Sequence, residues 1–223
     1  MEINPIAYFC SPLKTKFGVP RQGGVVPSLQ GRIVFEPAYR QLEGVRGLEG
    51  FSHLWLIWEF SANRHEQTGL TVRPPRLGGN ERVGVFASRS PYRPNRLGLT
   101  CVVISRIENH PQLGPVIHVL GADLMDNTPI YDVKPYIPYA DCHPDAIGGF
   151  VEQTDWHPLE VVIPKQCSSL FLKEDLDGLC EVLSQDPRPH YHDNPDRIYG
   201  MLYAGRDVRF RVENSKVYVV EIV

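Results

Sequence analysis

The sequence predicts a mainly β protein, in which an N-terminal β-barrel is followed by a small C-terminal α+β unit. The first 140 residues contain seven short segments rich in β-branched and aromatic residues, punctuated by Gly and Pro, and no sustained helical period. Strands without intervening helices favour a closed or nearly closed barrel over a parallel sheet. The expected strands are Ile6–Phe9, Gly31–Phe35, Phe51–Phe60, Val83–Ala87, Leu99–Glu108, Pro115–Asp123 and Ile130–Pro135.

We expect three parts along the chain: the barrel over residues 1–140, a connection over 141–164 and the α+β unit over 165–223. Within the barrel, Phe51–Phe60 carries apolar residues at both alternating sets of positions, which predicts a strand buried on both faces. The loops Ser11–Leu29 and Arg64–Asn80 are long for a compact domain. Long ordered loops often carry function, so both are candidates for a binding site.

The C-terminal unit is predicted from one helical pattern and three alternating segments. Ser168 is a candidate cap for a helix that runs to about Gln185, with Gly178 weakening it and Asp186-Pro187-Arg188-Pro189 ending it. The segments Ile198–Ala204, Asp207–Val212 and Lys216–Val223 predict a small antiparallel meander that packs on the helix. The apolar face of the helix comprises Leu172, Leu176, Leu179, Val182 and Leu183. About sixty residues are marginal alone, so we expect this unit to dock on the barrel.

Composition excludes several classes of protein. The chain has 223 residues, a net charge of −3, 42% hydrophobic residues and five cysteines. The cysteines form no Cys-x-x-Cys pair, which favours reduced thiols over a disulfide scaffold or a zinc site. His190 and His192 have no second cluster to complete a metal site, so we expect no metal. The N-terminus resembles no signal peptide and the longest apolar run is too short to cross a bilayer, so we expect a cytoplasmic protein.

The stretch from Ser88 to Leu99, which we call the arginine loop, has the composition of a ligand-binding loop. It contains three arginines, a tyrosine and an asparagine, and Pro91 and Pro94 restrict its backbone. The alternative is a solvated Pro-rich turn. Residues 73–106 hold seven arginines and one acid, a charge of +6, so the rest of the chain carries −9. A concentrated arginine patch on an acidic body indicates a face that meets phosphates.

Nucleotide-binding motifs of the common kinds are absent from the sequence. No Gly-x-Gly-x-x-Gly follows a strand and no Gly-x-x-x-x-Gly-Lys-Ser/Thr occurs, which argues against a Rossmann cofactor site. The segment Gly121–Pro129 predicts a strand that runs into a turn with two carboxylates, Asp123 and Asp126. Taken alone, an Asx turn in which Asp126 or Asn127 caps its own backbone explains that segment.

Taken together, four segments in this order match a known family. They are Val72–Gly79, Gly84–Asn95, Asp123–Pro129 and Asp132–Tyr136, and Asp186-Pro187-Arg188-Pro189 matches a C-terminal signature. The chain thus resembles the TrmO family, also called TsaA-like or YaeB-like proteins. The resemblance implies an S-adenosylmethionine-dependent tRNA methyltransferase on a β-barrel, acting as a homodimer. Its substrate would be N6-threonylcarbamoyladenosine beside the anticodon of threonine tRNA, at position 37, which becomes N6-methylated.

The resemblance also implies a set of site residues. The positions similar to the family's cofactor site lie in the first long loop, at the end of the Phe51–Phe60 strand, in the arginine loop and in the two-carboxylate turn. They are Gly23, Gly24, Val25, Ser61, Ala62, Arg89, Leu99, Asp123, Leu124, Met125 and Asp126. Carboxylates suit the ribose hydroxyls or the ammonium of the cofactor, and an arginine suits its carboxylate. One departure is Asn95-Arg96, where the family more often has Asn-Pro.

Catalytic and RNA-binding roles are assigned to the same motifs. The N6 nitrogen attacks the methyl group in line, and its proton needs an acceptor, for which Asp126 is the candidate, with Asn95 orienting the base. The expected RNA contacts are Tyr92, Arg93, Arg96, Lys134 and Tyr136, with core packing as the alternative for the tyrosines and especially for Tyr131. Two other functions remain open: a methyltransferase of the same fold with another RNA or small-molecule acceptor, and a non-catalytic RNA or nucleotide binder.

Overall fold

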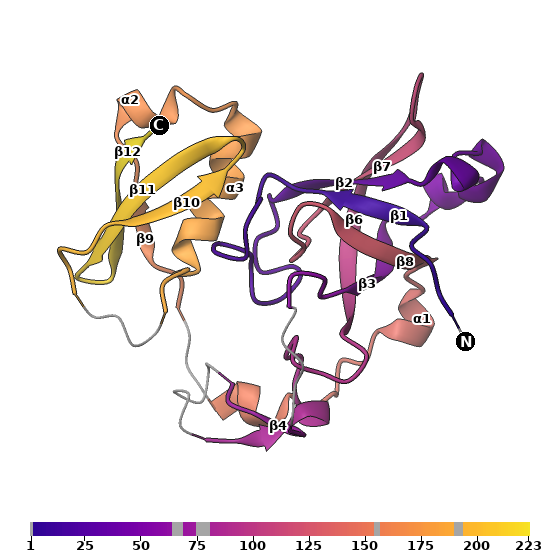
Figure 1. Cartoon of the computed structure of the whole chain (residues 1–223), viewed down its shortest axis with the longest axis horizontal. Helices are drawn as coiled ribbons and strands as arrows, with labels where there is room; N and C mark the ends of the chain where they lie inside the picture. Colours follow the sequence, from indigo (N-terminus) through magenta and orange to yellow (C-terminus); the bar gives the residue numbers. More distant parts are fainter. Residues whose placement is uncertain (1, 64–68, 75–80, 154–156, 190–193) are drawn as a thin grey trace.

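The computed structural model describes residues 2–63, 69–74, 81–153, 157–189 and 194–223. Figure 1 shows a barrel formed by the N-terminal part of the chain and, beside it, a sheet with one long helix formed by the C-terminal part. A pair of very short strands, β4 (Thr71–Val72) and β5 (Val83–Gly84), forms a separate sheet. The fold is therefore the expected mainly β barrel with an α+β unit.

Six strands close the barrel, in the order β1-β2-β7-β6-β3-β8. Every neighbouring pair is antiparallel. Alternate residues point inward and fill the barrel with side chains such as Phe9, Ile33 and Leu56. The strands are β1 (Ala7–Cys10), β2 (Gln30–Phe35), β3 (His53–Glu59), β6 (Leu97–His110), β7 (Gly114–Leu120) and β8 (Thr128–Pro135).

The barrel has six strands where the sequence predicted seven, because Val83–Ala87 is not one of them. Only β5 is extended there, and Val85–Ala87 forms the 3-10 turn η5. Val85 is fully buried whereas Phe86 is 74% exposed, so the segment anchors the arginine loop by one side chain. A short apolar run does not distinguish a buried strand from a single turn, which is why the prediction was wrong.

Strand β3 differs from the expectation of burial on both faces. Its burial alternates, with Leu54, Leu56 and Trp58 inside the barrel and the intervening residues only half-buried. Trp55 points outward, where its indole N–H donates to Asp141 at 3.0 Å. Asp141 belongs to α1 (Pro138–Asp141), which covers this part of the strand. Between β2 and β3 the chain forms the short 3-10 turns η1 (Pro37–Tyr39), η2 (Leu42–Val45) and η3 (Leu48–Gly50).

The C-terminal sheet contains the expected meander and one strand more. The meander is β10 (Tyr199–Tyr203), β11 (Arg206–Glu213) and β12 (Lys216–Ile222), all antiparallel. The additional strand, β9 (Glu160–Val162), pairs parallel with β12 and comes from the segment expected to be a connection. That segment also holds the 3-10 turn η6 (Gly149–Gln153).

The helical region begins later than predicted. Ser168 ends the short helix α2 (Lys165–Ser168), where its hydroxyl donates to the Lys165 carbonyl, so it caps no long helix. The long helix α3 (Lys173–Ser184) has Leu172 at its N-cap, and that side chain is 74% exposed instead of lying on the apolar face. Leu179, Val182 and Leu183 are buried, as expected.

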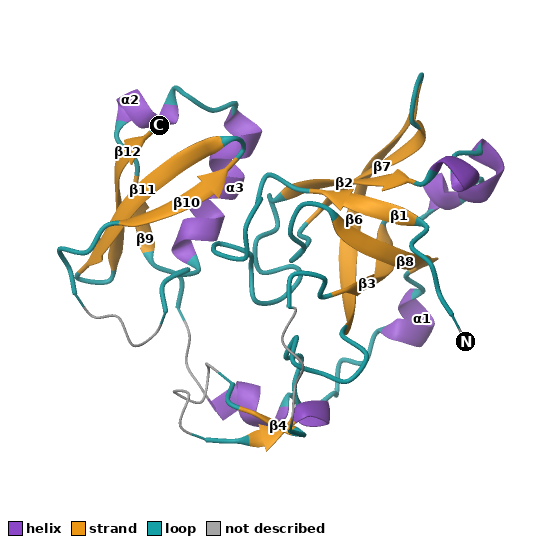
Figure 2. Ribbon diagram, in the orientation of Figure 1, coloured by secondary structure: helices purple, strands orange, loops and turns teal. Residues whose placement is uncertain are grey.

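The first long loop joins the two parts of the molecule. The amide N of Ala204 donates to the carbonyl of Pro12 at 2.9 Å, and both the amide and the hydroxyl of Ser28 donate to Glu181 at 2.8 Å. Three side chains of the loop are buried with α3 and the C-terminal sheet in one cluster, Leu13, Val26 and Leu29. Figure 2 shows this loop, in teal, between the barrel and the C-terminal unit. The unit is therefore docked on the barrel through the loop.

Candidate functional site

Four loops meet at one end of the barrel, where β3 and β7 end and β6 and β8 begin. Backbone hydrogen bonds tie the loops to one another: the amide of Phe60 donates to the Arg96 carbonyl at 2.8 Å and that of Gly24 to the Gly121 carbonyl at 2.8 Å. The amide of Asp126 donates to the Leu13 carbonyl at 2.9 Å. Residues 11–29, 60–63, 88–96 and 121–127 thus form one region, which we call the loop end.

Asp123 lies at the centre of the loop end on a chain of hydrogen bonds. The buried indole N–H of Trp58 donates to Thr100 Oγ1 at 3.0 Å, and Thr100 Oγ1 donates to Asp123 Oδ1 at 2.7 Å. An indole N–H can only donate, so the Thr100 proton is directed at the carboxylate. Burial raises the pKa of Asp123, while the hydrogen bond from Thr100 and the charge of Arg89 act against that rise.

The first long loop approaches Asp123 through two glycines. The backbone of Gly23 hydrogen-bonds to the Asp123 carboxyl group, and a Cβ atom on Gly23 would lie 2.5 Å from a methyl carbon of Thr100. Gly24 has φ of +80°, and a Cβ there would meet open space. Val25, the next residue, is half-buried and packs against the C-terminal core. Gly23 therefore permits a close approach that a larger residue would obstruct, and Gly24 adopts a backbone conformation that favours glycine.

The other residues predicted to bind the cofactor occupy different positions around the same end. Arg89 is exposed, and its guanidinium donates to Gln22 Oε1 at 2.8 Å. Ser61 and Ala62 are half-buried in the turn after β3. Leu124 is a core residue with no exposed surface, whereas Leu99 is 58% exposed. The Met125 carbonyl accepts the Thr128 hydroxyl at 2.7 Å.

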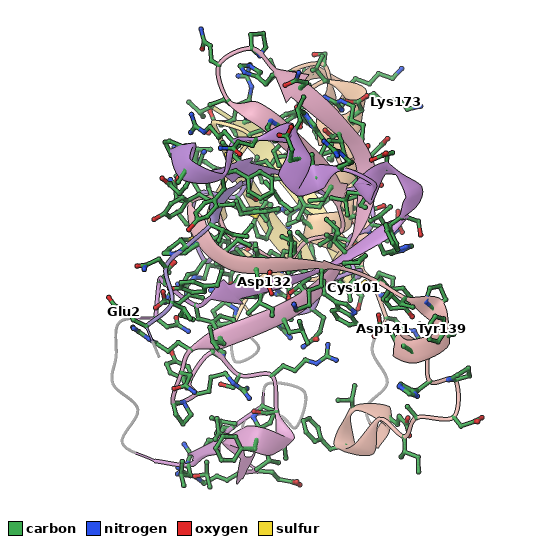
Figure 3. All side chains as sticks on the ribbon, turned by 90° about the vertical axis from the view of Figure 1, so that its right-hand side faces the viewer. Glu2, Cys101, Asp132, Tyr139, Asp141 and Lys173 are labelled. Carbon is green, nitrogen blue, oxygen red and sulfur yellow. The ribbon has the colours of Figure 1, made fainter. Side chains whose placement is uncertain are left out.

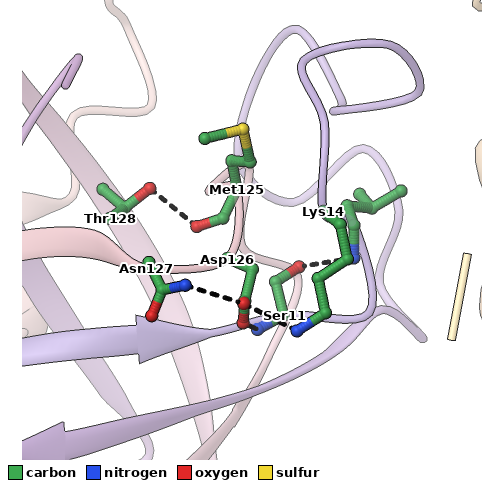
Figure 4. A network of polar contacts seen from close by, with 7 residues as sticks. Ser11, Lys14, Met125, Asp126, Asn127 and Thr128 are labelled. Atoms are coloured by element: carbon green, nitrogen blue, oxygen red, sulfur yellow. Dashed lines mark hydrogen bonds and ion pairs between the residues drawn. The ribbon is translucent and has the colours of Figure 1, made fainter. Parts of the chain in front are cut away.

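Asp126 is held by three donors, two from the first long loop and one from the next residue (Figure 4). Its Oδ1 accepts the amide of Ser11 at 2.9 Å, and its Oδ2 accepts Lys14 Nζ at 2.6 Å and Asn127 Nδ2 at 3.2 Å. The Asp126 side chain is 11% exposed. An Asx turn alone does not account for these contacts, since two of the donors come from more than a hundred residues away.

The arginine loop is held in shape by its own arginines. Arg93 donates to the carbonyls of Ser88 at 3.0 Å and Ser90 at 3.4 Å. Arg96 has φ of +51° and forms an ion pair with Glu59 at 3.1 Å. Tyr92 and Asn95 are exposed, and Tyr92 keeps 45% of its surface. Of this loop's predicted RNA contacts, the two arginines therefore already bind protein groups, and Tyr92 projects from the surface.

Tyr131 is half-buried, and its hydroxyl is bound to a protein group. Its hydroxyl donates to Glu59 Oε2 at 2.6 Å, and burial together with this hydrogen bond raises the pKa of Tyr131 to about 12. Glu59 thus receives Tyr131 on one oxygen and Arg96 on the other. The arginines predicted as one patch over 73–106 do not all belong to the arginine loop. Arg106 lies on β6, where its guanidinium is 3.7 Å from Glu108. Arg76 lies outside the described residues.

Lys134 and Tyr136 lie at the opposite end of the barrel strands. In the register of β3 and β8, Trp58 faces Ile130 near the loop end and Leu54 faces Pro135. Five residues of strand separate these positions by about 17 Å. Lys134 is ion-paired with Asp132 at 2.9 Å, and the Tyr136 ring lies beside those of His53 and Trp55. Figure 3 shows Tyr139 and Asp141 together on α1, the helix that follows this end of β8. A single chain does not bring these two residues to the arginine loop.

Sequence reasoning missed Trp58, Thr100 and the pair formed by Lys16 and Asn63. Lys16 Nζ donates to Asn63 Oδ1, which links the first long loop to the turn after β3. A threonine within an apolar strand does signal that its hydroxyl needs a partner when it is buried. That signal was present in Leu99-Thr100-Cys101-Val102 but did not identify the partner.

Metal ligands, disulfides and membrane spans add nothing to this site. Within the described ranges, His, Cys, Asp and Glu side chains form no group of three or more able to hold a metal. His190 and His192 lie outside those ranges. All five cysteines are free thiols, as predicted. In the part of the chain that the structure describes, no helix has the length and apolar character needed to cross a membrane.

Fold and site together define a β-barrel protein with a candidate site built from loops, and not a Rossmann-fold enzyme. Two family models match the chain: the N-terminal domain of tRNA-methyltransferase O over residues 8–142 and the C-terminal domain of TrmO over residues 158–223. The chain therefore belongs to the tRNA-methyltransferase O family, and it is an enzyme of the tRNA methyltransferase class.

Similar proteins agree with this assignment. The tRNA (adenine(37)-N6)-methyltransferase of Escherichia coli (strain K12) is 38% identical over 231 residues, covering 99% of this chain and 97% of that protein. A Pseudomonas aeruginosa protein named putative S-adenosylmethionine-dependent methyltransferase RcsF is 34% identical over 93% of this chain and 91% of its own length. The crystal structure of TrmO from Pseudomonas aeruginosa superimposes with a TM-score of 0.80 at 27% identity, covering 100% of this chain and 98% of that one.

Proposed function

We propose that this chain transfers a methyl group from S-adenosylmethionine to N6 of adenosine 37 in tRNA. Family membership supports methyl transfer to tRNA, and the name of the Escherichia coli relative supports the adenine N6 position. The name of the Pseudomonas aeruginosa relative supports S-adenosylmethionine as the methyl donor. The observation that carries the proposal is the loop end, where Asp123, Gly23 and Arg89 come together from three loops.

The donor set at the loop end suits the proposed cofactor. S-adenosylmethionine supplies a methyl group made electrophilic by its sulfonium. Asp123 offers a carboxylate for ribose hydroxyls or for an ammonium group, and Arg89 offers a guanidinium for a carboxylate. The open side of Gly24 admits a ligand close to the backbone. These groups, with Val25, Ser61, Ala62, Leu99 and residues 124–126, form the proposed cofactor site.

The remaining work of the protein is to orient N6, exclude water and accept a proton. Asp126 is the proposed acceptor and Asn95 the proposed orienting residue. A carboxylate has about four lone-pair positions. Asp126 Oδ1 accepts one backbone amide and Oδ2 accepts two donors, so Oδ1 retains one position for the N6 proton. Lys14 Nζ, 2.6 Å from Oδ2, holds the carboxylate in this position.

The substrate is proposed to be threonine tRNA that already carries N6-threonylcarbamoyladenosine. A carbamoyl substituent acidifies the N6 proton, and the exposed ring of Tyr92 offers a stacking surface for an anticodon-loop base. Arg93 and Arg96 lie beside it in the same loop. The proposal includes a cytoplasmic homodimer. In a homodimer, Lys134 and Tyr136 of one copy can contact RNA that is bound at the loop end of the other copy.

Cofactor binding tests this proposal through Asp123→Asn. The asparagine keeps an oxygen for Thr100 and Gly23 but loses the negative charge, so we expect the protein to fold and its affinity for S-adenosylmethionine to fall roughly 10-fold or more. Calorimetric titration measures the affinity, and thermal melting verifies the fold. Asp145→Asn, at an exposed position away from the loop end, is the matched control. Equal affinity of Asp123→Asn and wild type would remove Asp123 from the cofactor site.

A further inference from the structure

Three side chains from three segments meet beside the arginine loop. Glu59 ends β3 on the outer face of the barrel, Tyr131 belongs to β8, and Arg96 is the last residue before β6. The Arg96 guanidinium lies 3.1 Å from Glu59 Oε1, and the Tyr131 hydroxyl donates to Glu59 Oε2 at 2.6 Å. Both oxygens of one carboxylate are therefore engaged, one by the arginine loop and the other by the barrel wall.

Strand β8 is irregular at Tyr131. The β3 residues Ile57 and Trp58 are adjacent, but their partners in β8 are separated by one extra residue, Tyr131. A bulge of this kind changes the direction of a side chain, and bulges are frequent next to active sites. Here the hydroxyl of the extra residue reaches Glu59. The bulge therefore accounts for the contact between Tyr131 and this carboxylate.

The backbone of Arg96 adopts a conformation that depends on its surroundings. Its φ of +51° lies in the left-handed region, which residues with a Cβ atom rarely adopt. The Arg96 amide donates to the Arg93 carbonyl at 3.2 Å, and the Arg96 carbonyl accepts the Phe60 amide at 2.8 Å. Such a conformation persists only where neighbouring contacts maintain it. The ion pair with Glu59 adds a side-chain contact to these backbone bonds.

The turn at Arg96 affects the position of the exposed part of the arginine loop. Asn95 directly precedes Arg96, and Tyr92 lies four residues before it. Both side chains are exposed. The other half of the loop has its own support, because Arg93 donates to two carbonyls within residues 88–90. A loop held at both ends loses less conformational entropy when it binds a ligand.

The charge of Glu59 is unfavourable for RNA binding at this place. An acid beside an arginine loop repels polyanions such as RNA. The Glu59 side chain is 20% exposed and that of Arg96 46% exposed, so their ion pair is screened less than one between fully exposed groups. Glu59 therefore neutralises part of the positive charge of the loop. Its contribution to an RNA-binding surface has to come from the shape that it gives the loop.

We propose that Glu59 is a positioning residue, which holds the arginine loop in the shape that binds tRNA. Its bridge between Tyr131 and Arg96 fixes the turn, and the turn sets the positions of Tyr92 and Asn95. The inference rests on the proposed function and assigns residues that act behind the exposed loop. Arg96, which the sequence predicted as an RNA contact, is then a support of the turn.

The test replaces Glu59 by Gln and measures the affinity for threonine tRNA that carries the threonylcarbamoyl group. Gln keeps an oxygen for the Tyr131 hydroxyl and removes the charge that holds Arg96. We expect Glu59→Gln to bind this tRNA roughly 10-fold more weakly, because a loop that is no longer preorganised loses more entropy on binding. Thermal melting verifies that each variant is folded.

Two controls separate the shape of the loop from general damage. Glu43→Gln removes an acid that is 70% exposed and ion-paired with Arg46 in the region of η2, and it should bind tRNA like the wild type. In Glu59→Gln, the affinity for S-adenosylmethionine should stay at the wild-type value. Arg89, the proposed cofactor contact in the arginine loop, is held by Gln22 and not by Glu59.

Arg96→Gln removes the same ion pair from the other side. It should lose as much tRNA affinity as Glu59→Gln, and the double variant should lose no more than either single one. Arg96→Lys, which keeps the charge opposite Glu59, should recover most of the affinity. The slope of log K against log salt should not change in Arg96→Gln, whereas loss of a phosphate contact would reduce its magnitude by about 0.7. Tyr131→Phe removes only the hydroxyl and should weaken tRNA binding in the same direction, so it replaces Glu59→Gln if that variant does not fold.

The sign of the change in tRNA affinity is the decisive readout. On charge alone, removal of an acid beside the arginine loop strengthens RNA binding, whereas the proposal predicts weaker binding. Tighter or unchanged tRNA binding by Glu59→Gln overturns the proposal. A reduced salt slope in Arg96→Gln, or an equal loss of affinity for S-adenosylmethionine in Glu59→Gln, also overturns it. If the wild type itself does not bind tRNA, the proposed function fails independently of Glu59.

Discussion

At the scale of single residues, the hydrogen-bonded chain from Trp58 through Thr100 to Asp123 explains how one carboxylate is held at the barrel's end. The motif resemblance predicted Asp123 as a site residue, but it did not point to Thr100, which is 23 positions away in sequence and belongs to β6. From the sequence alone, Trp58 is one more apolar residue of a strand, and nothing points to its hydrogen bond. Contacts between distant strands depend on register, and register cannot be derived from one sequence with sufficient accuracy.

Thr100→Val removes the donor and keeps the shape of the side chain. The ionised form of Asp123 loses a hydrogen bond, so the variant raises the pKa of Asp123 beyond the rise that burial already causes. We therefore expect the acid limb of the pH profile for S-adenosylmethionine binding to move to higher pH. Thr100→Ser, which keeps the hydroxyl, should leave the limb in place. A limb that does not move in Thr100→Val would show that Thr100 does not act through Asp123.

We also expect Thr100→Val to change the stability of the folded protein and the dependence of that stability on pH. The folded pKa of Asp123 lies above its unfolded value, so ionisation of Asp123 opposes folding, and stability falls as pH rises through the folded pKa. Thr100→Val adds to this cost and leaves the Trp58 N–H without its acceptor, a loss of about 1–3 kcal/mol. Urea unfolding should show a larger deficit at pH 7 than at pH 4. A deficit that grows toward acid pH would contradict this assignment.

At the scale of elements, the sequence predicted what local patterns control. Six barrel strands and the C-terminal meander follow from alternation and from turn residues such as those at 213–215. The Val83–Ala87 strand and the Ser168 cap were wrong and β9 was not predicted, because each depends on three to five residues whose conformation is set by tertiary contacts. The sequence predicted that Gly178 weakens α3, but it did not show that Gly178 packs against Tyr203.

Gly178 lies where α3 meets the C-terminal sheet. A Cβ atom there would be 2.6 Å from the Tyr203 hydroxyl, so Gly178→Ala should force the helix away and cost about 1–3 kcal/mol. Helix propensity alone predicts the opposite, a gain of about 1 kcal/mol. Gly44→Ala, where a Cβ would meet open space, is the control. Chemical denaturation measures both, and a more stable Gly178→Ala would mean that propensity prevails over packing.

At the scale of the whole molecule, one loop belongs to both parts. Residues 11–29 supply Gly23 and Gly24 to the loop end and bury Leu13, Val26 and Leu29 in the core of the C-terminal unit. The length of this loop predicted a functional role, but its second partner was not predictable, because the contacts join residues that are more than 150 positions apart. The position of Lys134 and Tyr136 away from the arginine loop likewise became visible only with the register of β3 and β8.

The central claim is methyl transfer to a modified adenosine, and a rate comparison tests it most directly. Threonine tRNA is prepared with and without the threonylcarbamoyl group and incubated with the enzyme and S-adenosylmethionine, and the released nucleosides are analysed by mass spectrometry. The carbamoyl substituent makes the N6 proton easier to remove, so the modified tRNA should react far faster and yield N6-methylated threonylcarbamoyladenosine. Equal rates on the two tRNAs, or methylation of an unrelated RNA instead, would contradict the account.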